Sequence, residues 1–234
     1  MGRTAVSSEC SLLRRAIVGA QSLAVMLRNE GVEIISAPVV EPRDAVFAAG
    51  HHLIVGSLRA VTRRPEIEIF RSLAATSDIV PPGSHNEVDG AFLEGGDVIL
   101  NGDQAYVGMS GNASNLAGID WLAAKLGPAW RVVPMALRSS VRHLEDVLAL
   151  VRPGLLIQNP TLLVDGLPRA LRDWRSIDIG DGESANVLVL GENRVVVQQS
   201  QARLIAMLRA EGVEVSTLPL GGGLRSAHAA LLRE

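Results

Sequence analysis

The chain has 234 residues, a formal net charge of −3 and a mean hydropathy of +0.24. Hydrophobic residues make up 47% of it, which is enough for a buried core and excludes a disordered chain. The 22 basic and 25 acidic side chains form no basic run that could follow a phosphate backbone, so we expect no nucleic-acid partner.

The sequence also favours a location inside the cell. No uncharged apolar stretch reaches the roughly 18 residues of a membrane span, and the first residues lack a signal-peptide core. The single cysteine, Cys10, cannot form an internal disulfide and fits a reducing compartment. We therefore expect a cytoplasmic protein with no membrane contact.

An internal repeat is the main organising feature of the chain. Residues 23–34 read LAVMLRNEGVEI, and residues 204–215 read LIAMLRAEGVEV. Each copy has the pattern of an amphipathic helix that ends at a glycine, Gly31 or Gly212, and continues into a short β-branched strand. A repeated unit of this kind indicates a fold built from equivalent modules.

Between the two copies, hairpins alternate with helices and single strands. Apolar runs around Gly, Asn or Pro turns predict the hairpins, and apolar periodicity predicts the helices. The expected elements, in chain order, are hairpin 45–55, helix 65–75 and strand 78–80; hairpin 97–107, helix 113–126 and strand 130–137; hairpin 146–157, short helix 168–174 and strand 176–179; and hairpin 186–198 before the second helix copy.

These elements predict an α/β fold with one domain, residues 1–234. Five ββαβ modules of about 45 residues account for the length, so we expect a five-bladed α/β propeller of pseudo-symmetric modules around a central site. The fifth module would join both chain ends, with residues 227–231 paired to residues 4–7, which removes an exposed sheet edge. The alternative is an ordinary α/β sandwich with one chance repeat.

Polar residues stand directly before each predicted hairpin and would meet at one mouth of the ring. Any one of these motifs is as typical of a turn as of a site. Together they offer several carboxylates and one histidine, which suits a cationic substrate such as a planar guanidinium, with His143 as general acid or base. The residues concerned are Arg43, Asp44, Glu94, Asp97, His143, Glu145, Asp146, Glu183, Asn186, Arg225 and Ser226.

The same motifs resemble the guanidino-group-modifying superfamily with the pentein fold. That superfamily includes arginine deiminases, dimethylarginine dimethylaminohydrolases and arginine:amine amidinotransferases. The likeness runs from about Pro42 to the C-terminus. Five stretches carry it: Pro42-Arg-Asp44-Ala-Val-Phe with Arg59 and Arg63-Arg64-Pro-Glu66; Leu93-Glu-Gly-Gly-Asp-Val; His143-Leu-Glu145; Glu183-Ser-Ala-Asn-Val-Leu; and Gly221-Gly-Gly-Leu-Arg-Ser226.

The resemblance implies a covalent amidino intermediate that passes to water or to an amine. It makes Ser226, His143 and Glu94 the catalytic candidates: Ser226 at the position of the nucleophilic cysteine, His143 for proton transfer and Glu94 for holding the guanidinium. It implies no cofactor and no metal, and a small guanidino compound as the partner, with a homodimer left open. The candidate substrate-binding residues are Asp44, Glu145, Asp97, Arg59, Asn186 and Arg225.

The sequence departs from the superfamily pattern in three places. Position 226 is serine, whose hydroxyl ionises far less readily than a thiol, so Ser226 is an engineered replacement, the mark of a silent relative, or a nucleophile with an unusual base. Glu145 stands where the superfamily usually has aspartate. Residues 110–115 lack the arginine that often grips the substrate carboxylate in the hydrolases.

The subclass is open between three functions. The short chain without long insertions favours a hydrolase of the deiminase or dimethylaminohydrolase type acting on arginine or an arginine-like compound. Residues 115–121 and 153–160 favour the alternative, an arginine:amine amidinotransferase. Ser226 favours the third, a catalytically silent protein that binds guanidino compounds.

Overall fold

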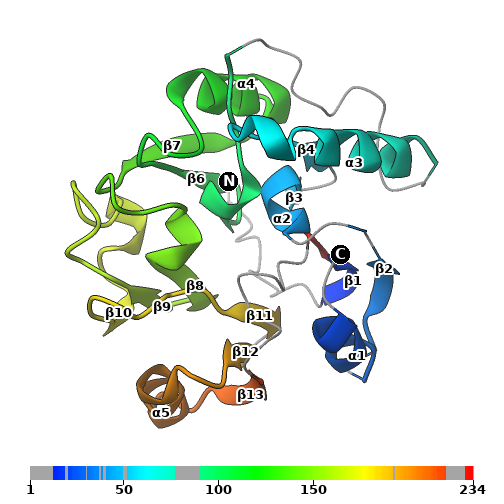
Figure 1. The fold of residues 1–234 in the computed structure, drawn as a ribbon. Coiled ribbons are helices and arrows are strands. Elements are labelled where there is room, and N and C mark those ends of the chain that lie inside the picture. The colour runs from blue at the N-terminus through cyan, green and yellow to red at the C-terminus, as the bar shows by residue number, and fades with distance from the viewer. Residues whose placement is uncertain are drawn as a thin grey trace, which may run out of the picture.

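The computed structural model describes residues 13–18, 21–29, 31–36, 38, 41–49, 52–76, 90–191, 193–219 and 230–233. The strands in these residues form five small sheets, four with three strands and one with two (Figure 1). Both candidates near the C-terminus, Arg225 and Ser226, lie outside the described residues, as do the predicted strand segments 4–7 and 78–80. None of the helices in the described ranges is long and apolar enough to cross a membrane.

The first sheet joins the two ends of the described chain. Its strand order is β14-β1-β2, with β1 parallel to β2 and antiparallel to β14, so that Ile17 lies opposite Ala230. The C-terminal segment thus pairs with the N-terminal part of the chain, as predicted, but its partner is β1, whereas the predicted partner, residues 4–7, lies outside the described residues. The elements are β1 (Leu13–Val18), α1 (Gln21–Asn29), β2 (Glu33–Ser36) and β14 (Ala230–Arg233).

The next two sheets follow the predicted hairpins closely. A short helix, α2 (Pro42–Ala45), leads into the antiparallel pair β3 (Val46–Ala49) and β4 (His52–Val55), which η1 (Val61–Arg63) and α3 (Pro65–Thr76) follow. The third sheet has the order β5-β6-β7, with β7 parallel to β6. Its elements are η2 (Gly95–Asp97), β5 (Val98–Asn101), β6 (Gln104–Met109), α4 (Leu116–Leu126) and β7 (Arg131–Ala136).

The last two sheets repeat this plan, with one difference from the predicted elements. The short helix expected at 168–174 is wrong, because only a three-residue 3-10 turn forms there. A segment of seven residues forms an α-helix only where tertiary contacts support it, because nucleation costs more than so few hydrogen bonds return. The elements are η3 (Leu144–Asp146), β8 (Leu148–Arg152), β9 (Leu155–Gln158), η4 (Arg169–Leu171), β10 (Arg175–Asp178), β11 (Leu188–Gly191), β12 (Arg194–Gln198), α5 (Ala202–Ala210) and β13 (Glu214–Leu218).

Turn chemistry fixes where these elements begin and end. The side chain of Asn115 caps α4 by accepting a hydrogen bond from the backbone of Gly118 at 3.0 Å. The β5–β6 and β8–β9 hairpins turn at Gly102 and Gly154, whose φ angles of +58° and +83° favour glycine. The predicted hairpins therefore form where the sequence places its turn residues.

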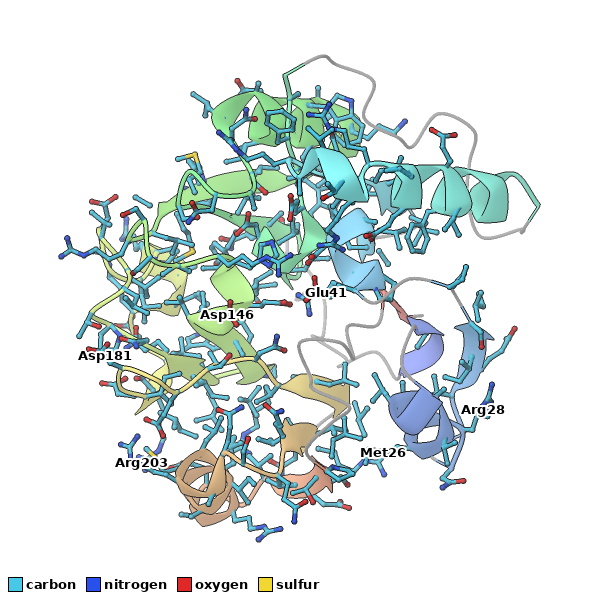
Figure 2. All side chains as sticks on the ribbon, viewed as in Figure 1. Met26, Arg28, Glu41, Asp146, Asp181 and Arg203 are labelled. Atoms are coloured by element: carbon cyan, nitrogen blue, oxygen red, sulfur yellow. The ribbon has the colours of Figure 1, made fainter. Side chains whose placement is uncertain are left out.

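Each sheet shares a buried core with the next one along the chain. Phe47 of β3 packs in one cluster with Val98 of β5, and Tyr106 of β6 packs in another with Leu156 of β9. Two further clusters join β9 to β12 and join β11 and β12 to α1 and β1. The sheets therefore follow one another around a common centre (Figure 1). Figure 2 shows the labelled Glu41 and Asp146 on the inner side of this arrangement.

Candidate functional site

Three buried ionisable side chains from separate turns meet near the centre. Asp44 lies in α2, Glu94 precedes η2 and His143 precedes η3, with 0%, 4% and 3% of their surface exposed. We call Asp44, Glu94 and His143 the central cluster. The structure therefore brings together three residues that stand before the first three predicted hairpins, 99 positions apart at the extremes.

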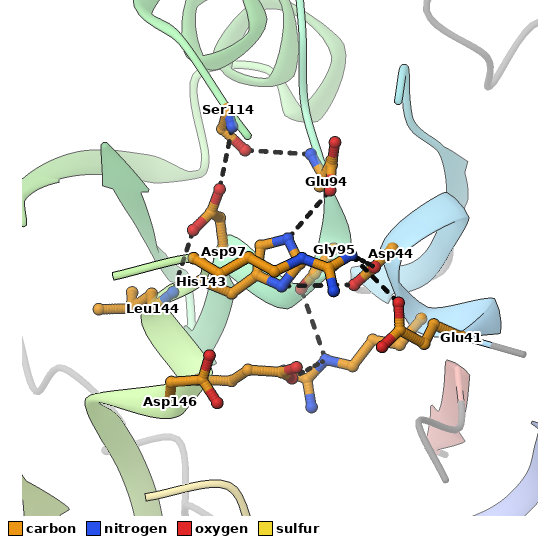
Figure 3. A network of polar contacts seen from close by, with 12 residues as sticks. Glu41, Asp44, Glu94, Gly95, Asp97, Ser114, His143, Leu144 and Asp146 are labelled. Atoms are coloured by element: carbon orange, nitrogen blue, oxygen red, sulfur yellow. Dashed lines mark hydrogen bonds and ion pairs between the residues drawn. The ribbon is translucent and has the colours of Figure 1, made fainter. Parts of the chain in front are cut away.

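His143 lies between the two carboxylates of the central cluster (Figure 3). Its Nε2 atom is 2.9 Å from Glu94 Oε2, and its Nδ1 atom is 3.6 Å from Asp44 Oδ1. Glu94 is oriented in turn, because its Oε1 atom accepts a hydrogen bond from the backbone N–H of Arg59 at 2.9 Å. Each ring nitrogen of the imidazole thus faces a negative charge.

This arrangement stabilises the protonated imidazole. Burial by itself lowers the pKa of His143, but the hydrogen bond to Glu94 and the charges of Asp44 and Asp97 outweigh it and raise the pKa from 6.5 to about 9. At neutral pH the ring is therefore a cation with a proton to donate. Such a group serves as a general acid before it serves as a general base.

The ligand atoms of the central cluster lie within 4.8 Å of one another, which is close enough to hold a metal ion. In the structure, however, the two carboxylates contact opposite ring nitrogens of His143, which is the arrangement of partners around an imidazolium. The cluster fits a clamped imidazolium better than a metal centre.

Two arginines neutralise the outer side of the cluster. Arg63 Nη1 lies 2.6 Å from Asp44 Oδ2 and 3.1 Å from Glu41 Oε2. Arg142 Nη2 contacts the same two oxygen atoms, each at 3.1 Å. Arg63 is fixed further by Glu66, at 2.9 Å for both of its hydrogen bonds. Asp44 Oδ2 thus already binds two guanidinium groups of the protein itself.

The two glycines between Glu94 and Asp97 permit this close packing. A Cβ atom on Gly96 would lie 2.8 Å from the His143 ring and 2.9 Å from Asp44 Oδ1. A Cβ atom on Gly95 would lie 2.0 Å from the backbone oxygen of Arg43. The Glu-Gly-Gly-Asp sequence is therefore needed for the approach of three turns and not for a flexible loop.

Asp97 lies behind the central cluster and binds backbone groups. It is fully buried, its Oδ1 atom accepts from Leu144 N and its Oδ2 atom accepts from Ser114 N, both at 3.0 Å. The Ser114 hydroxyl accepts from Glu94 N at 3.0 Å. We call Asp97, Ser114 and the amide of Leu144 the backbone anchor. It links the turn that carries Glu94 to the turn that carries His143.

Glu145 lies beside the cluster in an ion pair with Arg43. Arg43 Nε is 3.2 Å from Glu145 Oε2, and the guanidinium also donates to the backbone oxygens of Gly95 and Val98. Burial raises the pKa of Glu145 to about 7, although the charge of Arg43 opposes the shift. Its carboxyl group is therefore near its titration point at neutral pH.

The remaining candidates have different surroundings. The guanidinium of Arg59 lies over the ring of Phe92, 5.3 Å from its centroid, and is exposed, so within the described residues Arg59 reaches the cluster through its backbone. Asn186 is buried, and its backbone N–H donates to Ser184 Oγ, which donates to Asp146. Asn186 therefore lies on the Asp146 side of the centre. The structure does not describe Arg225 and Ser226.

Sequence reasoning missed three residues that shape this site: Glu41, Ser114 and Arg142. Arg142 directly precedes His143, and Glu41 stands one residue before the Pro42-Arg-Asp44 motif. Their nearness to the motifs was the one available signal. Ser114 gave none, because a serine in a polar loop is ordinary.

Comparison with known proteins identifies relatives over most of the chain, although no family model matches it. The chain is 24% identical over 229 residues to the uncharacterized protein YkgA of Bacillus subtilis, which covers 90% of this chain and 78% of that protein. It is 32% identical over 134 residues to the putative inosamine-phosphate amidinotransferase 2 of Streptomyces griseus and 29% identical over 167 residues to a dimethylarginine dimethylaminohydrolase of Streptomyces coelicolor.

Solved structures show the fold. A dimethylarginine dimethylaminohydrolase from Pseudomonas aeruginosa matches with a TM-score of 0.78 at 19% identity, over 94% of this chain and 100% of that one. The amidinotransferase SxtG from Microseira wollei matches with a TM-score of 0.77 at 18% identity, over 96% and 95% of the two chains. The chain has the fold of these two enzymes, and its resemblance to dimethylarginine dimethylaminohydrolases and amidinotransferases is confirmed.

The matched lengths limit what this chain shares with its named relatives. The aligned segments span 48% of this chain and 38% of the putative amidinotransferase, and 70% of this chain and 59% of the dimethylaminohydrolase from Streptomyces coelicolor. Relatives of both kinds, hydrolases and amidinotransferases, occur among the matches.

Proposed function

We propose that this chain binds a guanidino compound at the central cluster and modifies it at the guanidinium carbon through a covalent amidino intermediate. The observation that carries the proposal is the buried imidazolium of His143 between Glu94 and Asp44. Arginine, or a compound with an arginine-like side chain, is the substrate class. The dimethylarginine dimethylaminohydrolases among the relatives are named for a compound of this class, which supports the choice.

The proposed fold completes the site. We infer that the five sheets are the blades of a closed propeller and that residues 1–234 form one domain. The pairing of β14 with β1 supports this closure. In that ring Ser226, four residues before β14, would lie at the same centre as His143 and Glu94.

The reaction divides into two proton-balanced steps. In the first, the side chain at position 226, in its deprotonated form, forms a bond to the guanidinium carbon, a C–N bond breaks, and the departing amine takes a proton from His143. In the second, water or an amine attacks the carbon, His143 takes one of its protons, and the bond to position 226 breaks to release the deprotonated side chain; with water as the acceptor, its second proton passes to the released amine. The pKa of about 9 suits His143 to the first step at neutral pH.

We assign separate roles to the other carboxylates. Glu94 orients the imidazolium and, with Asp44, attracts the cationic substrate. Asp97 acts by positioning Glu94 and His143 instead of touching the substrate, because both of its oxygens bind backbone N–H groups. Substrate contacts by Glu145, Arg59, Asn186 and Arg225 stay predictions.

A hydrolase is slightly favoured, and two alternatives to it remain. An amidinotransferase is supported by the relatives of Streptomyces and by SxtG. A silent guanidino-binding protein is supported by Ser226. Two similar structures carry cysteine-to-serine mutants with a bound ligand, citrulline in one and substrate in the other, so a serine protein of this fold retains binding. Cytoplasmic location and a homodimer stay predictions.

Ser226→Cys tests the proposal directly. We expect the variant to turn over L-arginine or a close analogue, because a thiol ionises where a serine hydroxyl does not. A ureido product with release of ammonia or an amine indicates a hydrolase. Ornithine that forms only with an added amine indicates a transferase.

Ser200→Cys is the matched control, because this exposed serine lies outside the site. It should show no turnover. A folded Ser226→Cys protein that binds guanidino compounds without turning them over would contradict the enzyme and favour the silent binder.

A further inference from the structure

Arg142 differs from the other charged side chains around the central cluster in its exposure. Half of its side chain, 51%, is open to solvent, against 19% for Arg63 and 1% for Asp44. Even so, its guanidinium reaches the buried Asp44 Oδ2 and Glu41 Oε2, each at 3.1 Å. A guanidinium of the protein therefore occupies Asp44, one of the two carboxylates that the proposed function gives to a guanidinium substrate.

The two arginines on Asp44 are not equivalent. Arg63 has a shorter contact to Asp44, 2.6 Å, and two more hydrogen bonds to Glu66. Arg142 has only Asp44 and Glu41 as ion-pair partners within the described residues. The positive charge of Arg63 also works against that of Arg142. Of the two, Arg142 is the weaker ligand and the one that can leave, while Arg63 keeps Asp44 in place.

The backbone around Arg142 does not need to move for the side chain to leave. The Asn112 amide donates to the backbone oxygens of Ser139 and Val141, at 2.7 and 2.8 Å, and the Ser110 hydroxyl donates to that of Arg142 at 3.4 Å. The turn before His143 is therefore fixed. An exposed arginine side chain changes rotamer freely, so its head group can exchange with solvent.

We propose that Arg142 is a resident competitor for the substrate cation: its guanidinium occupies Asp44 and Glu41 in the free protein and yields that place to the guanidinium of the substrate. This inference rests on the proposed function. Binding then exchanges one guanidinium for another on the same carboxylates, so the net charge of the cluster stays constant. The site discriminates against neutral ligands, because a neutral head group does not replace the charge of Arg142 and therefore does not displace it.

Calorimetry on Arg142→Gln tests the exchange. An exposed ion pair of this kind lowers the apparent affinity of a competing ligand by only a few fold, so L-arginine should bind about three to five times more tightly to Arg142→Gln than to the wild-type chain. L-Citrulline, which is neutral, should gain less. Arg142→Lys, which keeps a charge but loses the planar fork, should lie between the two proteins.

Arg138→Gln is the matched control, since Arg138 is exposed in the same segment and no described ion pair involves it. Its affinity for L-arginine should equal that of the wild-type chain. In the NMR spectrum, the Arg142 Nε–Hε signal, identified by its loss in Arg142→Gln, should move toward the solvent-exposed position on addition of L-arginine.

The outcomes separate this inference from the proposed function. Unchanged or weaker binding of L-arginine to Arg142→Gln, or an equal gain for L-citrulline, overturns the competitor role while leaving guanidino binding intact. If neither the wild-type chain nor any variant binds a guanidino compound, the proposed function fails and the competitor role fails with it.

Discussion

The central cluster and the backbone anchor use buried carboxylates in opposite ways. Glu94 and Asp97 are only three residues apart, and both are almost completely buried. Glu94 binds the ring of His143, a group that changes charge, whereas Asp97 binds two backbone N–H groups. Burial alone therefore does not show that a carboxylate takes part in chemistry. The group that the carboxylate binds does.

The same contrast appears in the electrostatics. Burial raises the pKa of Asp97 to about 6 even though His143 and two backbone bonds oppose the shift. The carboxylates of the central cluster instead raise the pKa of His143. We therefore expect changes in the anchor to alter stability first, and changes in the cluster to alter binding first.

The largest expected effect is that of Asp97→Asn on stability. The amide offers one acceptor where two N–H groups need one each, so a buried donor loses its partner along with the charge. We expect the free energy of unfolding to fall by about 3 to 4 kcal/mol, measured by chemical denaturation. Asp103→Asn, in the exposed β5–β6 turn, is the control and should change little. An unchanged midpoint for Asp97→Asn would remove the distinction between the two regions.

The second prediction concerns pH and His143. The folded chain binds the His143 proton more tightly than the unfolded chain, because the pKa is about 9 in place of 6.5. The stabilisation is therefore complete below pH 6.5 and disappears as the pH rises through 9, a loss of about 3 kcal/mol.

Denaturation of the wild-type chain and of His143→Gln at a series of pH values measures this loss. Between pH 6.5 and 9, the free energy of unfolding of the wild-type chain should decrease relative to that of His143→Gln. Parallel curves would show that the two carboxylates do not stabilise an imidazolium.

The smallest expected effect is that of Glu94→Gln on ligand binding. Replacing the carboxylate by an amide removes a charge-assisted hydrogen bond, which is worth about 2 kcal/mol, or about thirtyfold in the affinity for L-arginine. Above pH 9, where the His143 imidazolium no longer stabilises the fold, stability should change by less than about 1 kcal/mol, because Gln fills the same volume and its oxygen still accepts from Arg59 N. Calorimetry measures the affinity, with Glu214→Gln on the exposed side of β13 as the control. A larger loss of stability than of affinity would place Glu94 with the anchor.

Local sequence patterns determined much of the fold. The repeated helix and strand appear as α1 with β2 and as α5 with β13, and the four hairpins form around the turn residues that predicted them. These features were predictable because helix periodicity, strand alternation and turn residues act over a few neighbouring positions. The prediction of a short helix at 168–174 was wrong, because a segment of this length forms a helix only where tertiary contacts support it.

The equivalence of the modules also predicted that Asp44, Glu94 and His143 would meet, since each precedes a hairpin. Which partner each side chain binds was decided by the tertiary structure alone. The reach of Arg142 to Asp44, 98 residues away, and the bonds of Asp97 to the amides of Ser114 and Leu144 depend on how separate turns pack. A sequence pattern specifies the turn on which a side chain lies, but the partner comes from a different module, and its distance is set only when the sheets share their cores.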